Sequence, residues 1–127
     1  MAGINDMINA RMPDEVELFA DSIPVFVEEA MAEMHWSNRM ENDLEILEKS
    51  IIADMVALAL IMPSMSHYKK SIKKAKGEGA GEAEFLDNKL EWLQQIQSKL
   101  ENSIAYKKTV LLVSVGVGAP MVLIESV

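Results

Sequence analysis

Two long stretches of apolar residues at helical spacing constrain the fold of this chain more than any other feature. The first runs from Met40 to Met62, with apolar residues at Leu44, Leu47, Ile51, Met55, Leu58 or Ala59, and Met62. The second runs from Glu82 to Lys108, with a narrower stripe at Leu86, Leu90, Leu93, Ile96 or Gln97, Leu100 and Ile104. Steps of three and four residues predict amphipathic helices, and a narrow seam packs against another helix. We predict a mainly α fold, either a helical hairpin or a small bundle of long helices.

A lysine- and glycine-rich stretch, residues 67–81, separates the two patterns. It holds five lysines between positions 69 and 76, followed by Gly77, Gly79 and Gly81. Glycine is unfavourable inside helices and common in loops, so we predict an exposed connector here and an amphipathic helix over residues 82–108.

The N-terminal part of the chain carries shorter patterns. Residues 1–12 show little periodicity and are predicted to form a flexible arm. A short helix is expected from Asp14 to about Asp21, because acidic side chains suit a helix N-terminus. Pro24 cannot continue that helix but fits the first turn of the next one. Residues 13–66 are therefore predicted to form an acidic helical half.

Two positions interrupt the helical patterns of this half. The Trp36-Ser37-Asn38 step is either a turn or a polar stretch inside one long helix. Pro63 is predicted to end or kink the first long helix, because proline lacks an N–H and clashes with the preceding turn.

The C-terminal segment, residues 109–127, is uncharged from Thr109 to Ile124. β-Branched residues on both sides of a Gly/Pro turn, residues 116–120, favour a short β-hairpin, and continuation of the preceding helix is the alternative. The segment's apolar side chains are expected to be buried against protein, within the subunit or between neighbours. The whole chain, residues 1–127, is expected to be one domain.

Charge is distributed unevenly. Residues 1–66 hold 13 acids and 3 bases, whereas residues 67–127 hold 7 acids and 9 bases, within a total of −8. Nucleic acid would repel the acidic half, so no nucleic-acid partner is expected. A basic helical face is predicted to make electrostatic contact with an acidic protein surface, or alternatively to be simply a solvated connector: Lys69, Lys70, Lys73 and Lys74.

Asp54 lies within the most apolar run of the chain, residues 51–62. Burying a bare carboxylate costs several kcal/mol, so its side chain must be hydrated, protonated or paired. We predict either exposure to water or pairing with Lys49, Lys107 or Lys108. A buried ion pair can fix the register between helices.

Motifs for catalysis and metal binding are missing from the sequence. The chain has no cysteine, and His35 and His67 lie outside metal-binding motifs such as HExxH. No GxSxG nucleophile elbow or phosphate-binding GxxxxGK[ST] loop is present. We therefore expect a protein that is not an enzyme, without catalytic residues, metal or cofactor.

Membrane insertion is less favoured than association with protein. The apolar stretches at residues 50–66 and 109–124 are shorter than the roughly 20 residues that a spanning helix needs, and each contains proline. The first residues lack the pattern of a cleavable signal peptide, so cytoplasmic synthesis and incorporation into a larger particle are expected.

These observations favour a structural protein: a self-associating helical subunit of a homo-oligomer, filament or shell, such as a virion or secretion-machine component. The alternatives are a small acidic chaperone or antagonist of a basic protein partner, and a membrane-active helical protein. The partner is expected to be a second copy or another protein. The predicted self-association residues are Leu86, Leu90, Leu93, Leu100, Ile104, Val110, Val113, Met121 and Ile124.

Overall fold

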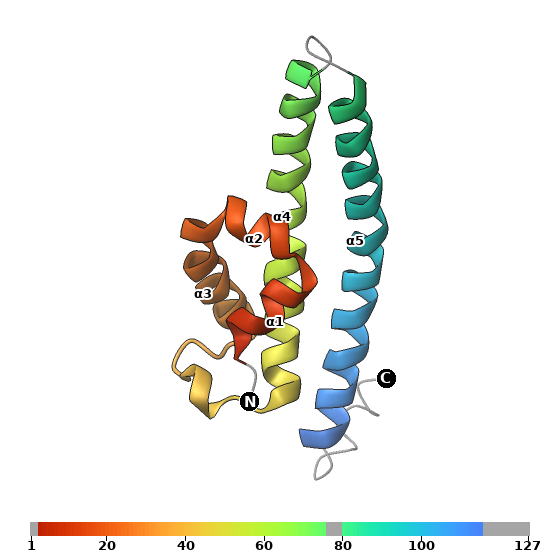
Figure 1. The fold of residues 1–127 in the computed structure, drawn as a ribbon. Coiled ribbons are helices and arrows are strands. Elements are labelled where there is room, and N and C mark those ends of the chain that lie inside the picture. Colours follow the sequence, from red (N-terminus) through yellow and green to blue (C-terminus); the bar gives the residue numbers. More distant parts are fainter. Residues whose placement is uncertain (1–2, 76–79, 116–127) are drawn as a thin grey trace.

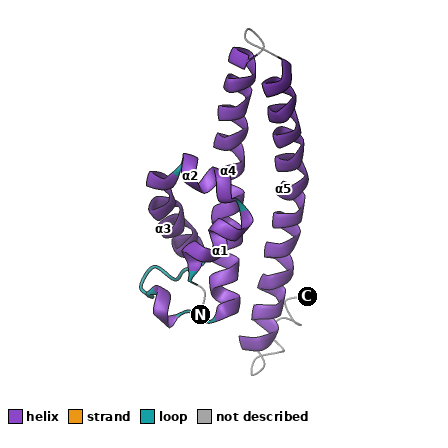
Figure 2. Ribbon diagram, in the orientation of Figure 1, coloured by secondary structure: helices purple, strands orange, loops and turns teal. Residues whose placement is uncertain are grey.

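The computed structural model describes residues 3–75 and 80–115 (Figure 1). Helices connected by short loops make up these ranges, which contain no strand (Figure 2), and the prediction of a mainly α fold is confirmed. The elements in chain order are α1 (Ile4–Arg11), α2 (Pro13–Leu18), η1 (Ala20–Ser22), α3 (Ile23–Glu33), η2 (Glu41–Asp43), α4 (Ile46–Ala75) and α5 (Ala80–Val115).

The two long helices, α4 and α5, run antiparallel side by side as a hairpin (Figure 1). The predicted stripe of α5 supplies buried residues to this contact, namely Leu86, Leu93 and Leu100. The buried face of α4 is rotated from its predicted stripe, of which Ala59 is exposed and Met62 is 70% exposed. Fully or almost fully buried apolar side chains on these helices are Ile51, Ile52, Ala53, Val56, Ala57, Leu60, Ile61 and Leu93. The predicted hairpin of long helices is therefore the frame of the fold.

An N-terminal layer, formed by α1, α2 and α3, packs against the part of α4 that begins at Ile46 (Figure 1). The end of α4 near Ala75 extends beyond this layer and lies beside α5 alone (Figure 1). The N-terminal layer thus covers one half of the hairpin, while the other half projects beyond this layer.

The prediction of a flexible arm over residues 1–12 is wrong, because α1 occupies most of it. Ile4, Ile8 and Met12 recur every four residues, which places them on one helical face, and all three are buried. The Ile4 N–H donates a 2.8 Å hydrogen bond to the Glu41 carboxylate, which satisfies a donor at the helix N-terminus.

Prolines and a left-handed residue set the bounds of α2 and α3. Pro13 and Pro24 occupy first-turn positions, so the expected role of Pro24 is confirmed. After α3, His35 has a φ of 64°. Its N–H donates to the Ala32 carbonyl at 3.0 Å, and the Trp36 N–H donates to the Met31 carbonyl at 2.8 Å. This pair of bonds is a Schellman motif, so the Trp36 step is a turn.

The bounds of α4 differ from the predicted ones at both ends. It begins at Ile46 rather than near Met40, and the Glu48 carboxylate accepts a 2.8 Å hydrogen bond from the Glu45 N–H before its first turn. Pro63 does not end the helix, which continues to Ala75 because its apolar face still packs against α5. The proline removes one hydrogen bond without terminating the element.

Helix α5 is also longer than predicted at both ends. The expected connector at residues 67–81 is wrong over 67–75 and from Ala80 onward, where the chain is helical. Helical continuation, the alternative for the C-terminal segment, is confirmed up to Val115. The predicted β-hairpin turn lies outside the described residues, as do Met121 and Ile124. No helix in the described ranges is both long and apolar enough to cross a membrane.

Candidate functional site: polar clusters and two charged surfaces

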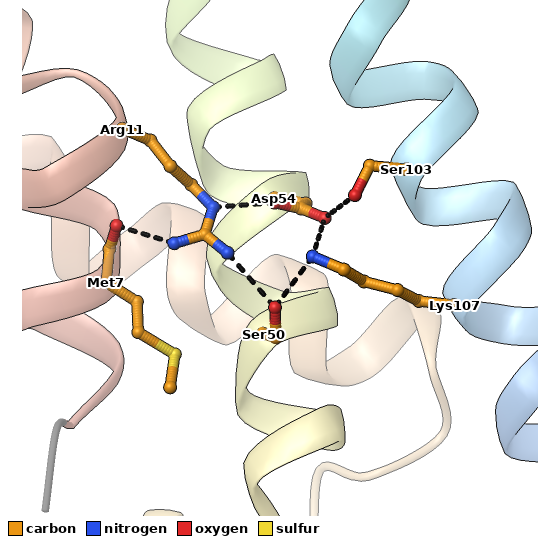
Figure 3. A network of polar contacts seen from close by, with 6 residues as sticks. All are labelled: Met7, Arg11, Ser50, Asp54, Ser103 and Lys107. Carbon is orange, nitrogen blue, oxygen red and sulfur yellow. Dashed lines mark hydrogen bonds and ion pairs between the residues drawn. The ribbon is translucent and has the colours of Figure 1, made fainter.

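A buried ionic network centred on Asp54 joins three helices (Figure 3). Asp54 on α4 is 2% exposed. Its Oδ1 accepts a 2.6 Å hydrogen bond from Arg11 Nε on α1. Its Oδ2 accepts hydrogen bonds from Lys107 Nζ at 2.8 Å and Ser103 Oγ at 2.7 Å, both on α5. The predicted pairing of Asp54 with Lys107 is confirmed, whereas Arg11 was missed because α1 was expected to be an arm.

The donors of this network have further acceptors (Figure 3). Arg11 also donates to the Met7 carbonyl at 2.8 Å and to Ser50 Oγ at 3.0 Å, and Lys107 donates to Ser50 Oγ at 2.7 Å. Burial opposes ionisation of Asp54, but the hydrogen bonds from Lys107, Arg11 and Ser103 outweigh it and lower the pKa of this carboxyl. Asp54 is thus an ionised anchor for α1 and α5.

A second buried cluster surrounds Glu15, a fully buried residue of α2. Its Oε2 accepts hydrogen bonds from Tyr68 Oη at 2.6 Å and lies 2.8 Å from Lys89 Nζ. Lys89 Nζ also lies 3.2 Å from Asp14 and 4.2 Å from the centroid of the Trp92 ring. Burial and the neighbouring Glu15 carboxylate raise the pKa of Tyr68. This cluster joins α2 to both helices of the hairpin.

Both clusters neutralise charges within the subunit rather than collecting ligands for a metal. In the part of the chain that the structure describes, no group of three His, Cys, Asp or Glu side chains is arranged to hold a metal ion. The buried carboxylates have cationic partners from other helices, as expected for ion pairs that fix helix register.

A basic surface lies on the projecting part of α4. Four lysines are exposed there, and none of the ion pairs between described residues includes them: Lys69, Lys70, Lys73 and Lys74. The first three of them border an open groove of about 390 Å³, here called the lysine groove, which is lined by Met62, Met65, Ser66, Lys69, Lys70 and Lys73. Met62 is 70% exposed, so apolar surface adjoins the positive charges.

An acidic surface lies on the N-terminal layer. From Pro13 to Glu33 the chain has no Lys or Arg, and every acidic residue except Glu15 is exposed: Asp14, Glu17, Asp21, Glu28, Glu29 and Glu33. The outward side of α3, here called the acidic ridge, consists of Val25, Glu28, Glu29, Ala32 and Glu33. Val25 is 51% exposed, so this surface also has an apolar element.

The predicted self-association seam on α5 has a partner within the subunit. Leu86, Leu93 and Leu100 are buried in the core that α5 shares with α4. Half-buried members are Leu90, Ile104 and Val110, while Val113 is 61% exposed. Met62, a member of the predicted stripe of the first long helix, is exposed, and the exposed apolar residues that periodicity did not single out are Leu18, Val25, Met40, Ile46, Phe85, Tyr106 and Leu112.

A further open pocket, of about 480 Å³, lies where α3, the following turn, α4 and the end of α5 meet. Arg39 forms a bidentate pair with Glu48, at 2.9 and 3.0 Å, and lies 5.4 Å from the Trp36 ring centroid. The hydrogen bond from Arg39 lowers the pKa of Glu48 despite partial burial. Leu111 and Leu112 supply the apolar wall. The pair at this pocket holds the turn against the start of α4.

The two charged surfaces are the features of this subunit that bear on its function. No protein-family model, curated protein or solved structure matches this chain.

Proposed function

We propose that this protein is a non-enzymatic assembly subunit that associates with further copies of itself. The observation that carries this proposal is the presence of two exposed surfaces of opposite charge on one subunit: the lysine groove of α4 and the acidic surface of the N-terminal layer. Surfaces of unlike character favour heterologous contacts, which repeat from one copy to the next.

Apolar residues beside each charged surface support the proposal. Met62 in the lysine groove is 70% exposed and Val25 on the acidic ridge is 51% exposed. A protein interface needs an apolar core with a polar rim, and rim charges mainly steer association and select the partner. The lysine groove and the acidic ridge each have an exposed apolar residue and charged residues beside it.

A second candidate function is that of a small acidic chaperone or antagonist. It is favoured by the absence of any Lys or Arg between Pro13 and Glu33, which gives the N-terminal layer a uniformly negative character. In this case the acidic surface binds a basic protein of another kind. The lysine groove then has no part in assembly.

Molecular mass in solution tests the proposal. We expect the mass from light scattering to exceed the 14.1 kDa of one chain at micromolar concentration and to rise with concentration. Raising salt from about 0.1 to 1 M, which shortens the Debye length from about 10 to about 3 Å, should reduce it. A single species of monomer mass throughout contradicts self-association. Complex formation only after a basic protein is added supports the second candidate.

A further inference from the structure

The lysine groove and the acidic ridge have similar lengths as well as opposite charges. Exposed residues on α3 recur at positions 25, 28, 29 and 32, which is the spacing of one straight helical ridge. The groove residues on α4 recur at 62, 66, 69, 70 and 73, which also share one helical face. At a rise of 1.5 Å per residue, α3 is about 16 Å long and the 62–73 stretch about 18 Å.

We propose that the acidic ridge of one subunit docks into the lysine groove of a second copy, with α3 lying along α4. This inference rests on the proposed self-association and names its contact. Val25 packs against Met62 and Met65, whose flexible thioether side chains adapt to irregular apolar surfaces. Glu28 and Glu29 lie opposite the exposed lysines. The contact therefore has an apolar centre flanked by complementary charges.

The two surfaces of one subunit cannot satisfy each other. Helix α3 packs inward through Ile23, Ala30 and Met31, so the acidic ridge faces away from the hairpin. The lysine groove lies farther along α4, toward the end that projects beyond the N-terminal layer (Figure 1). Each contact therefore takes its ridge and its groove from different copies, and the second groove and second ridge stay open for further copies.

Two variants test this contact, each blocking one side of it. The groove variant carries Lys69→Glu and Lys70→Glu, and the ridge variant carries Glu28→Lys and Glu29→Lys. All four side chains are exposed, so the fold is expected to persist. Like charges across the contact should weaken association at least about tenfold in either variant alone.

Each variant has a control with the same net charge and with substitutions at exposed positions of α5. The groove control carries Gln94→Glu, Gln95→Glu and Lys99→Glu. The ridge control carries Glu91→Lys and Glu101→Lys. Both controls should assemble like the original protein, because they change total charge without touching either surface.

Mixing the two blocked variants distinguishes a ridge-in-groove contact from general electrostatic attraction. The groove variant keeps an intact ridge and the ridge variant an intact groove, and their reversed groove and reversed ridge are complementary as well. An equimolar mixture should therefore assemble again, with the two variants alternating. A single chain with all four substitutions should assemble again, because both charges are reversed.

The outcomes separate this contact from self-association in general. If the original protein assembles and the blocked variants assemble equally well, or their mixture stays monomeric, the docking of α3 on α4 is wrong and the proposed function stands. If the original protein is monomeric at every concentration, both proposals fall.

Discussion

Arg11 Nε and Asp54 Oδ1 lie 2.6 Å apart, joining the first helix of the chain to the middle of α4. Lys107 reaches the other oxygen of the same carboxylate from α5. One side chain therefore connects three helices that the chain supplies at widely separated positions. The relationship explains why an acid is tolerated in the most apolar run of the sequence: two cations and a hydroxyl replace the water that burial removes.

We expect Asp54→Asn to lower the free energy of unfolding by about 3 kcal/mol, because Arg11 and Lys107 lose the anion that pairs both. Urea unfolding followed by circular dichroism measures this difference. Asp87→Asn, at an exposed position on α5, is the matched control and should change stability by less than about 0.5 kcal/mol. Equal effects from the two substitutions would refute the anchoring role of Asp54.

Stability should fall in acid. Asp54 and Glu48 have native pKa values below the usual ones, so the unfolded chain takes up protons that the native state does not. The contribution of these two carboxylates to the free energy of unfolding is complete above their unfolded pKa values of about 4. It is lost as pH falls through their lower native pKa values. Urea midpoints measured from neutral pH downward should decrease, and less steeply in Asp54→Asn. Parallel curves for the two proteins would contradict this assignment.

Tyr68→Phe is expected to lower the free energy of unfolding by about 1–3 kcal/mol, because buried Glu15 loses one of its donors. Tyr106→Phe is the control, since Tyr106 is 70% exposed. Thermal unfolding of both variants measures the difference. A Tyr68 variant as stable as the control would show that the 2.6 Å bond contributes nothing measurable.

His35→Gly should stabilise the protein by about 0.5–1 kcal/mol. His35 has a φ of 64°, a conformation that strains residues with a Cβ and is most often occupied by glycine after a helix. Ala105→Gly, at an exposed position inside α5, provides the opposite control and should destabilise by about 1 kcal/mol. A loss of stability in His35→Gly would mean that the histidine side chain itself supports the turn.

The long helices could be predicted because their apolar stripes extend over many turns, but their ends could not. Pro63 was expected to end or kink α4 because it removes a hydrogen bond, yet packing against α5 on both sides of the proline keeps the helix intact. Likewise, Lys69–Lys74 have the spacing of a helix, but the glycines that follow favoured a loop. Tertiary contact decided between local preferences that the sequence left balanced.

The short helix α1 and its part in the ionic network could not be predicted for a related reason. Its apolar face consists of Ile4, Ile8 and Met12 alone, a pattern too brief to distinguish from chance. Because residues 1–12 were predicted to be a flexible arm, Arg11 was not among the predicted partners of Asp54, whereas Lys107 was. The exposed surfaces depend in turn on which parts of α4 the N-terminal layer covers, and helical periodicity does not reveal that.

The incomplete cover of the hairpin implies that amide hydrogens along α4 exchange with solvent by two routes. Around Ile52 and Val56, the helix is enclosed by α5 and the N-terminal layer, so exchange there requires global unfolding. Tyr68 still contacts α2, whereas the end of α4 near Ala75 extends beyond the N-terminal layer and, among the described elements, lies beside α5 (Figure 1). The two helices can separate from this projecting end while the rest stays native. The lysine-bearing turns are therefore the part of the helix whose protection is lost first, and a partner that binds there should slow exchange at those amides above all.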